Sequence, residues 1–212
     1  MAAVKGYIEK IKYRNEDNGY TVLSISGLDD GEEYVLVGTF SYIAEGEMIE
    51  VSGRMTEHPI YGEQMAVESY ELKAPEDTVS MERYLGSGAI KGVGAALASR
   101  IVKKFKADTF RIMEEEPERL AEVKGISEKM AMSIGEQVEE KRDMRQAMMF
   151  LQNYGISINL AVKIYQEYGP AMYTILQNNP YKLADDIPGV GFKMADEIAA
   201  KIGIVADSDF RI

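Results

Sequence analysis

The stretch Ile90-Lys91-Gly92-Val93-Gly94 decides the fold of the larger part of this 212-residue chain. Its glycines permit a tight reversal of the backbone, and its apolar residues can fill the space between two helices. Apolar residues then recur at Leu97, Ile101 and Phe105, which is the spacing of an α-helix that begins after the reversal. The pattern is therefore typical of a helix-hairpin-helix.

This hairpin occurs four times in the sequence. A shift of 63 residues aligns Gly92 with Gly155, and one further inserted residue aligns Gly125 with Gly189. Spacings of 33, 30 and 34 residues separate the first, second, third and fourth hairpins, which lie at residues 92–94, 125–127, 155–157 and 189–191. A single Gly-apolar-Gly triplet usually serves only to pack a bundle, but four at near-constant spacing indicate an internal duplication of a binding unit.

The chemistry of each hairpin follows from its backbone. Amides of the hairpin and of the first turn of the next helix have no intrahelical partner, so they can donate to a phosphate oxygen. Such contacts hold the DNA backbone without reading bases. Only the first and fourth hairpins keep both glycines, whereas Ser127 and Ser157 place a side chain where a phosphate has to approach most closely.

Basic residues favour the first hairpin, because no acidic residue occurs between positions 83 and 107. The fourth hairpin is flanked by lysines but also by Asp196 and Glu197. We expect the main DNA contacts from Lys91, Gly92, Val93, Gly94, Arg100, Lys103, Lys104, Gly189, Val190, Gly191 and Lys193. Weaker contacts are expected from Gly125, Ile126, Ser127, Gly155, Ile156 and Ser157.

The first 74 residues follow a different pattern. Runs rich in Val, Ile, Tyr and Thr alternate with turn sequences, and they predict strands at residues 4–14, 19–26, 33–40, 47–57 and 64–73. Five strands in so short a segment predict a small closed barrel, of which the OB-fold is a common form. We predict a multidomain chain of β and all-α parts, with an OB-like barrel at residues 1–74 and tandem helix-hairpin-helix domains at residues 75–145 and 146–212.

The net charge and its distribution along the chain bear on which ligands each part can bind. Acidic residues outnumber basic ones by 35 to 24, and residues 1–74 hold 14 acidic and only 6 basic residues. Because the local field at the contact face governs DNA binding, we expect the hairpins to bind DNA despite the net charge, although weakly. Aromatic residues of the barrel suit the stacking of single-stranded DNA, but its acidity favours docking against another protein or domain.

The sequence predicts neither a catalytic nor a metal site. Cysteine is absent and His58 is the only histidine, which excludes thiol nucleophiles, disulfides and Cys/His zinc sites. No Gly-x-x-x-x-Gly-Lys-Ser/Thr loop occurs, so the chain cannot hydrolyse ATP alone. The carboxylates at residues 114–116 and 185–186 are expected to flank helix ends. Without a signal peptide or membrane-spanning run, the sequence predicts a cytoplasmic protein that contacts no membrane.

Several strings are more specific than the hairpin pattern. They are Tyr61-Gly62-Glu63-Gln64, residues 84–94, residues 179–183 and residues 189–196. On these strings the chain resembles the amino-terminal region of bacterial RecD-like ATP-dependent DNA helicases, the type that works without RecB and RecC. The resemblance extends from Gly6 to residues 207–212. The hairpin glycines of that family correspond to Gly92, Gly94, Gly125, Gly155, Gly189 and Gly191.

The resemblance implies that the chain is a fragment of a larger enzyme. In that family an OB-like barrel and tandem helix-hairpin-helix units precede a motor that moves 5′ to 3′ on single-stranded DNA in repair and recombination. The motor uses ATP and magnesium, whereas no cofactor is expected in this segment. The chain stops at Ile212, where the family continues toward its motor.

We interpret the chain as the non-catalytic DNA-positioning region of such a helicase, whose first and fourth hairpins hold the backbone at a fork or a duplex–single-strand junction. One alternative is a protein-interaction module that docks the helicase motor or a replication or repair protein. Another is a junction-binding scaffold similar to RuvA, which would be a tetramer that prefers four-way DNA. A stand-alone enzyme is the least favoured interpretation.

Overall fold

The computed structural model describes residues 1–209, with side chains up to residue 203. Residues 210–212, at which the resemblance ends, lie outside the described residues. The chain divides into two compact units, of which unit 1 is residues 1–145 and unit 2 begins at residue 146. In the part of the chain that was searched, no helix combines the length and the apolar character that crossing a membrane requires.

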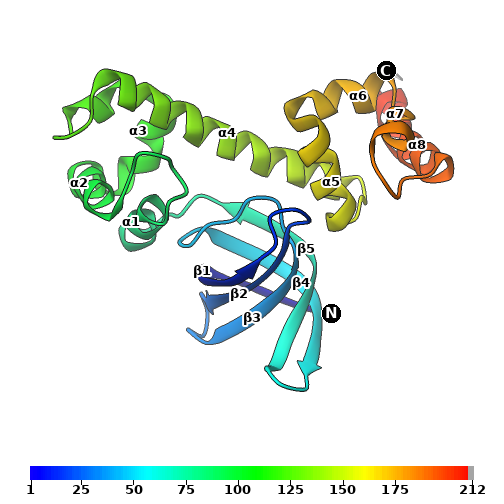
Figure 1. The fold of residues 1–212 in the computed structure, drawn as a ribbon, viewed down its shortest axis with the longest axis horizontal. Helices are drawn as coiled ribbons and strands as arrows, with labels where there is room; N and C mark the ends of the chain where they lie inside the picture. Colours follow the sequence, from blue (N-terminus) through cyan, green and yellow to red (C-terminus); the bar gives the residue numbers. More distant parts are fainter. Residues whose placement is uncertain (210–212) are drawn as a thin grey trace. The chain divides into compact units, whose positions relative to one another are not determined.

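Unit 1 begins with a closed five-stranded barrel in the order β1-β2-β3-β5-β4 (Figure 1). Antiparallel pairing of β1 with β4 closes the sheet, and a short parallel pairing joins β3 to β5. The strands are β1 (Ala2–Arg14), β2 (Tyr20–Gly27), β3 (Glu33–Thr39), β4 (Met48–His58) and β5 (Gly62–Lys73). The predicted five-stranded OB-like barrel is thus confirmed, and each strand lies within three residues of its expected bounds.

The barrel interior is filled by aliphatic side chains from every strand. Fully buried residues are Ile8, Leu23, Ile25, Leu36, Ile49, Val51 and Met65. Phe40 packs on Tyr70 with ring centroids 4.7 Å apart, so two of the aromatic residues noted in the sequence are core residues. This burial provides most of the driving force for a barrel of this size.

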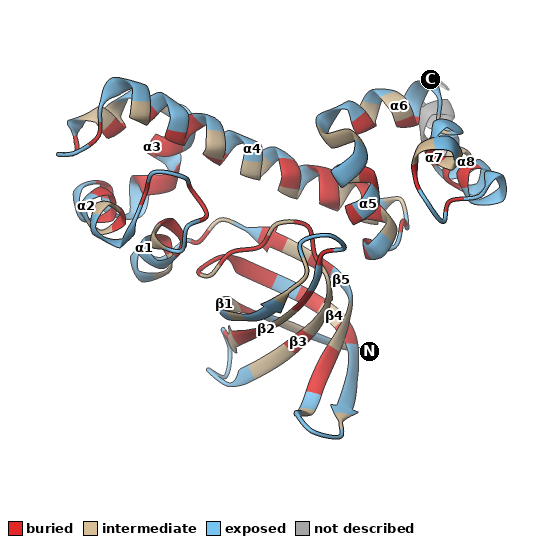
Figure 2. Cartoon of the chain, in the orientation of Figure 1, coloured by how far each residue is buried: buried red, intermediate tan, exposed pale blue. Residues whose placement is uncertain are grey.

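Helices complete unit 1. They are α1 (Thr78–Gly86), α2 (Ala95–Phe105), η1 (Lys106–Asp108), α3 (Thr109–Glu115), η2 (Pro117–Glu122) and the first part of α4 (Glu128–Asn153). Asp77 caps α1 by accepting the Ser80 amide at 2.8 Å, which fixes where the helical part begins after the barrel. Tyr84, Leu85, Ile101, Met113 and Ile134 form the centre of the helical core. The buried faces of these helices are visible in Figure 2.

A buried ion pair joins the barrel to α4 within unit 1. Nε and Nη2 of Arg145 each lie 3.0 Å from Oε2 of Glu47, whose side chain is 2% exposed. The other oxygen, Oε1, accepts the Ala44 amide at 2.7 Å. Burial raises the pKa of the Glu47 carboxyl, and the Arg145 guanidinium opposes this shift. The pair therefore ties together two segments almost 100 residues apart in sequence.

Unit 2 repeats the helical pattern. After the last residues of α4 it contains α5 (Ile158–Tyr168), η3 (Gly169–Ala171), α6 (Met172–Asn178), α7 (Lys182–Asp186) and α8 (Phe192–Asp209). Its core residues include Leu151, Ala161, Ile164, Leu176, Leu183 and Ala195. Residues 145 and 146, where the sequence suggests that two helical domains meet, both lie inside α4, and the division into three domains stays a prediction.

Candidate nucleic-acid interface

All four hairpins place their first glycine in the left-handed region. The φ angles are +91° at Gly92, +99° at Gly125, +75° at Gly155 and +89° at Gly189. In the first, second and fourth hairpins the apolar residue that follows donates its amide to the carbonyl three residues earlier, at 3.1–3.2 Å. This is a β-turn in which the third residue requires positive φ, so glycine is needed there by the backbone itself.

The third hairpin reaches the same shape by another hydrogen-bonding pattern. Gly155 N–H donates to the carbonyl of Gln152, and Ile156 N–H donates to the carbonyl of Leu151. These bonds form a Schellman motif that ends α4. The duplicated sequence thus produces a similar reversal after a 26-residue helix and after the much shorter helices that precede the other hairpins.

Each hairpin buries its central residue and exposes its flanks (Figure 2). Val93, Ile126, Ile156 and Val190 are 4–6% exposed, whereas the glycines and serines on either side of them are exposed. The apolar residue therefore anchors the turn in the helical core. The polar backbone around it faces outward, as a contact with a phosphate requires.

The last residue of each Gly-apolar-Gly/Ser hairpin, at positions 94, 127, 157 and 191, determines how the first turn of the next helix is capped. Ser127 Oγ accepts the Met130 amide at 3.1 Å, and Ser157 Oγ accepts the Leu160 amide at 3.4 Å. Gly94 has no side chain to make this cap at the start of α2, and Gly191 has none at the start of α8. Amides that serines occupy in the second and third hairpins thus lack this partner in the first and fourth.

The fold does not require glycine as the last residue of the first and fourth hairpins. A Cβ atom added at Gly94 or Gly191 would meet no atom within 4 Å, and neither residue has a positive φ. Gly94 adopts an extended conformation with φ −98° and ψ −177°, which other residues also adopt. The free space at these two glycines lies at the starts of α2 and α8.

Within unit 1 each hairpin is held by a side chain of the other half of the repeat. Arg100 Nη1 on α2 donates to the carbonyl of Lys124, next to the second hairpin, at 3.2 Å. Gln137 on α4 donates its amide to the Lys91 carbonyl at 3.2 Å and accepts the Lys91 N–H at 2.7 Å. Arg100 therefore belongs with the second hairpin, and the main-chain amide of Lys91 already has a protein partner.

Unit 2 contains the corresponding contacts at the repeat spacing. Lys201 Nζ on α8 lies 3.5 Å from the carbonyl of Gly155 in the third hairpin. Lys163 Nζ on α5 lies 3.9 Å from the position of a Cβ atom on Gly189 in the fourth hairpin. Lys163 lies 63 residues after Arg100, so the shift that aligns the two halves of the duplication also aligns these two basic residues.

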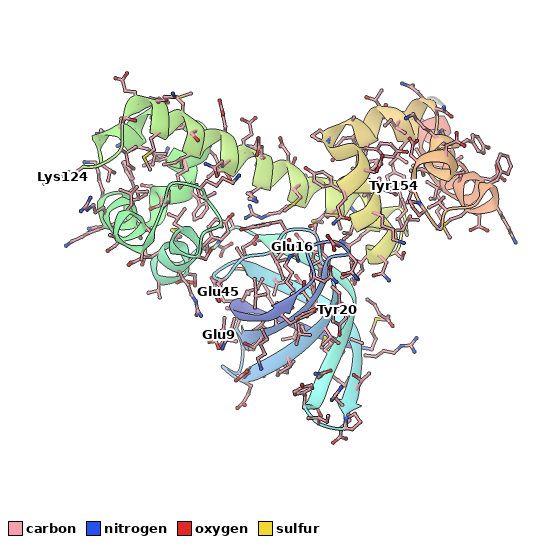
Figure 3. The ribbon with its side chains drawn as sticks, in the orientation of Figure 1. Glu9, Glu16, Tyr20, Glu45, Lys124 and Tyr154 are labelled. Atoms are coloured by element: carbon pink, nitrogen blue, oxygen red, sulfur yellow. The ribbon has the colours of Figure 1, made fainter. Side chains whose placement is uncertain are left out.

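The other basic residues named from the sequence do not all lie at a hairpin. Lys91 and Lys193 are exposed beside the first and fourth hairpins. Lys103 and Lys104 are exposed in the last turn of α2, about 14 Å along the helix axis from Gly94. Lys124 is exposed beside the second hairpin, and its side chain points away from the helices in Figure 3.

The carboxylates at helix ends make ion pairs. Glu116 contacts Arg111 at 3.1 Å and Arg119 at 3.5 Å, while Asp186 contacts Lys182 at 2.8 Å. His58 Nδ1 accepts the main-chain amides at residues 60 and 61, a turn role. Within the described residues, no group of three or more His, Cys, Asp or Glu side chains is placed to hold a metal ion.

The barrel carries a surface pocket of about 510 Å³, which brings together some of the aromatic residues that the sequence suggested for stacking. Exposed Tyr13, Tyr20 and Tyr61 lie in its wall, and the first two have ring centroids 6.3 Å apart. Figure 3 labels Tyr20 on the barrel. The described lining contains no carboxylate and consists of Lys12, Tyr13, Tyr20, Val22, Val35, Val37, His58, Tyr61 and Gln64.

Known proteins match the chain along its length. Residues 1–75 match the OB-fold domain of the ATP-dependent DNA helicase YrrC, and residues 85–140 match the SAM-like helix-hairpin-helix tandem. Residues 140–212 match the helix-hairpin-helix domain of the ATP-dependent RecD2 DNA helicase. The chain is also 29% identical over 218 residues to the ATP-dependent RecD2 DNA helicase of Deinococcus radiodurans. That match covers 99% of this chain but 30% of the relative.

The barrel, the repeated hairpins and the family matches agree in order and position. The OB-fold match ends two residues after β5, and the helix-hairpin-helix matches contain the positive-φ glycines of all four hairpins. Along its length the chain is thus similar to the OB-fold and helix-hairpin-helix domains of RecD2-type DNA helicases.

Proposed function

We propose that this region binds the DNA backbone through the first and fourth hairpins and positions DNA for a helicase motor. The observation that carries the proposal is that Gly94 and Gly191 have no side chain to cap the helices that follow them, next to exposed backbone and open space. A helix start of this kind attracts an anion by its amides and its dipole. Lys91 beside the first hairpin and Lys163 beside the fourth add positive charge.

The activity of the whole protein is also part of this proposal. The relative in Deinococcus radiodurans is named an ATP-dependent RecD2 DNA helicase, and this chain spans less than a third of its length. We place the hydrolysis of ATP with magnesium, and 5′ to 3′ movement in repair and recombination in the cytoplasm, in a motor outside the domains described above. The hairpins would then hold fork or junction DNA against that motor.

The test exploits the serines that the chain already carries. Replacing both glycines, Gly94→Ser and Gly191→Ser, gives the first and fourth hairpins the cap found in the other two, without strain or clash. Because serine caps at least as well as glycine, the fold keeps its stability while amides are withdrawn from DNA. We expect affinity for forked DNA to fall by about tenfold at 50 mM salt, on the order of one charge-assisted hydrogen bond.

The measurement is fluorescence anisotropy of a labelled fork across a salt series. The unaltered chain should show a slope of log K against log salt of about −3 if it neutralises 3 or 4 phosphates, and the double variant a shallower one. The matched control is Ser127→Gly with Ser157→Gly, which uncaps the middle hairpins and should not weaken binding. Equal affinities for the unaltered chain and the Gly-to-Ser variant would contradict the proposal.

A second candidate function concerns the barrel pocket. Its three exposed tyrosines can stack on the bases of single-stranded DNA, and Lys12 can contact a phosphate. The absence of carboxylates among the described lining residues is notable in a barrel whose surface is otherwise acidic. Glu33 lies at the edge of this lining, with Oε1 3.6 Å from Lys12 Nζ, so Lys12 contacts a phosphate by exchanging this ion pair.

Removal of one ring should therefore weaken single-strand binding. We expect Tyr13→Ala to lower affinity for oligo(dT) by about fivefold or more, and Tyr13→Phe, which keeps the ring, to have little effect. Tyr13 is 54% exposed, so neither change disturbs the core. Unchanged oligo(dT) binding in Tyr13→Ala, together with loss of binding to a motor fragment supplied separately, would instead identify the pocket as a protein-docking site.

A further inference from the structure

The fourth hairpin differs from the other three in the residue that begins the next helix. Phe192 directly follows Gly191 and is 69% exposed. At the same place the first hairpin has Ala95, the second has Glu128, and the third has Ile158, which is buried. A large exposed aromatic residue therefore stands beside only one of the four backbone-binding turns, in a hairpin that keeps both glycines.

Phe192 is held in a defined orientation by Tyr181. The two rings stack with centroids 5.2 Å apart and an angle of 20° between their planes. Tyr181 Oη donates to Asp196 Oδ1 at 2.7 Å, and this bond raises the pKa of the Tyr181 hydroxyl. Tyr181 is thereby fixed to α8, one turn beyond Phe192, so the ring pair is ordered before any ligand arrives.

The charges around the ring pair indicate which kind of ligand could bind over it. Lys163 Nζ lies 3.9 Å from the Cβ position on Gly189, and exposed Lys193 follows Phe192. Among the nearby acidic groups, Asp196 accepts from Tyr181 and Asp186 contacts Lys182 at 2.8 Å, while Glu197 is exposed on α8. An apolar ring beside uncapped amides and ammonium groups matches a nucleotide, whose base is flat and apolar and whose phosphate is anionic.

We infer that the Phe192–Tyr181 pair stacks on an unpaired base next to a phosphate held by the fourth hairpin. Bases inside an intact duplex have both faces covered by their neighbours, so the ring can stack only where a base is unpaired or terminal. The pair therefore gives the fourth hairpin a preference for a duplex–single-strand junction that backbone amides alone cannot supply. This inference rests on the proposed DNA binding and assigns the structure of the DNA that is bound.

The test compares forked DNA with a relaxed, closed-circular duplex, which has no terminal bases. We expect Phe192→Ala to weaken fork binding by about fivefold or more and to leave binding to the circle unchanged. Phe192→Tyr keeps two stacked rings and leaves the Tyr181–Asp196 hydrogen bond in place, so it should bind the fork as the unaltered chain does. Because Phe192 is 69% exposed, thermal unfolding of Phe192→Ala should match that of the unaltered chain.

A spectroscopic probe reports stacking directly. With 2-aminopurine at the first unpaired position of the fork, the unaltered chain should quench its fluorescence on binding, and Phe192→Ala should not. The inference is overturned if Phe192→Ala and the unaltered chain have the same ratio of affinities for forked and circular DNA and quench 2-aminopurine equally. If Gly191→Ser weakens binding to both DNAs while Phe192→Ala changes neither, only the inference fails. If Gly191→Ser has no effect either, the proposed backbone binding fails too.

Discussion

Replacing Arg145 with methionine should lower the free energy of unfolding by about 3–5 kcal/mol, because the change leaves a buried carboxylate without its partner. Glu47 is 2% exposed, and Nε and Nη2 of Arg145 are each 3.0 Å from its Oε2. Methionine retains most of the apolar stem of arginine, so the loss reports the charge rather than the volume. Urea denaturation of the chain at pH 7.5 measures the effect.

The control is the double variant Glu47→Gln with Arg145→Met. It removes both charges while glutamine Oε1 can still accept the Ala44 amide, so most of the lost stability should return. A double variant as unstable as the single one would contradict this account, and would assign the effect of Arg145 to its packing and its hydrogen bond with Tyr84 Oη.

The single variant should also acquire a pH dependence. Burial raises the pKa of the Glu47 carboxyl, and removing the opposing Arg145 charge raises it further. A folded-state pKa above the unfolded value of about 4.3 means that the folded protein binds the proton more tightly. The loss in free energy of unfolding caused by Arg145→Met should thus be small at pH values below the pKa that Glu47 has in the unfolded chain. It should grow as the pH rises through the pKa that Glu47 has in the folded variant. A pH-independent deficit would contradict this.

Gly46→Ala is the second substitution with a large expected effect. A Cβ atom there would lie 2.6 Å from the Ser80 carbonyl oxygen and 2.7 Å from the Tyr84 nitrogen, both in the backbone of α1. Gly46 also has a φ of +89°. We expect the free energy of unfolding to fall by about 3 kcal/mol, from the sum of the clash and the left-handed backbone.

Gly62→Ala separates the two causes. Gly62 has a φ of +80°, but a Cβ atom there would meet nothing within 4 Å. This variant should therefore lose only the conformational part, about 1 kcal/mol. Equal losses at Gly46 and Gly62, measured by thermal unfolding, would show that α1 retreats from the barrel loop without cost.

Local signals in the sequence predicted most of the fold. Alternating apolar residues and turn glycines identified all five strands, because both are local features of the sequence. The hairpins were predicted because positive φ restricts the first position to glycine, and each of the four glycines has the required angle. By contrast, residues 139–146 contain no glycine or proline, which agrees with the continuity of α4 through the suggested domain boundary.

Contacts between distant residues were not predictable in the same way. Glu47 is one of 35 acidic residues, and nothing local distinguishes it as the one that meets Arg145 across 98 positions. Gln137 and its contact with Lys91 were missed because glutamine carries no charge to attract notice. The exposure of Phe192 was hidden by periodicity, since an apolar residue at a helix start usually signals burial.

The exchanged contacts in unit 1 have a mechanical consequence. Arg100 connects α2 to the second hairpin, and Gln137 connects α4 to the first, so neither turn can be displaced without dragging the helix that follows the other. Force applied to one turn is thus divided between two helix starts. Two turns braced in this way are displaced together, so both contacts have to open before either turn moves alone.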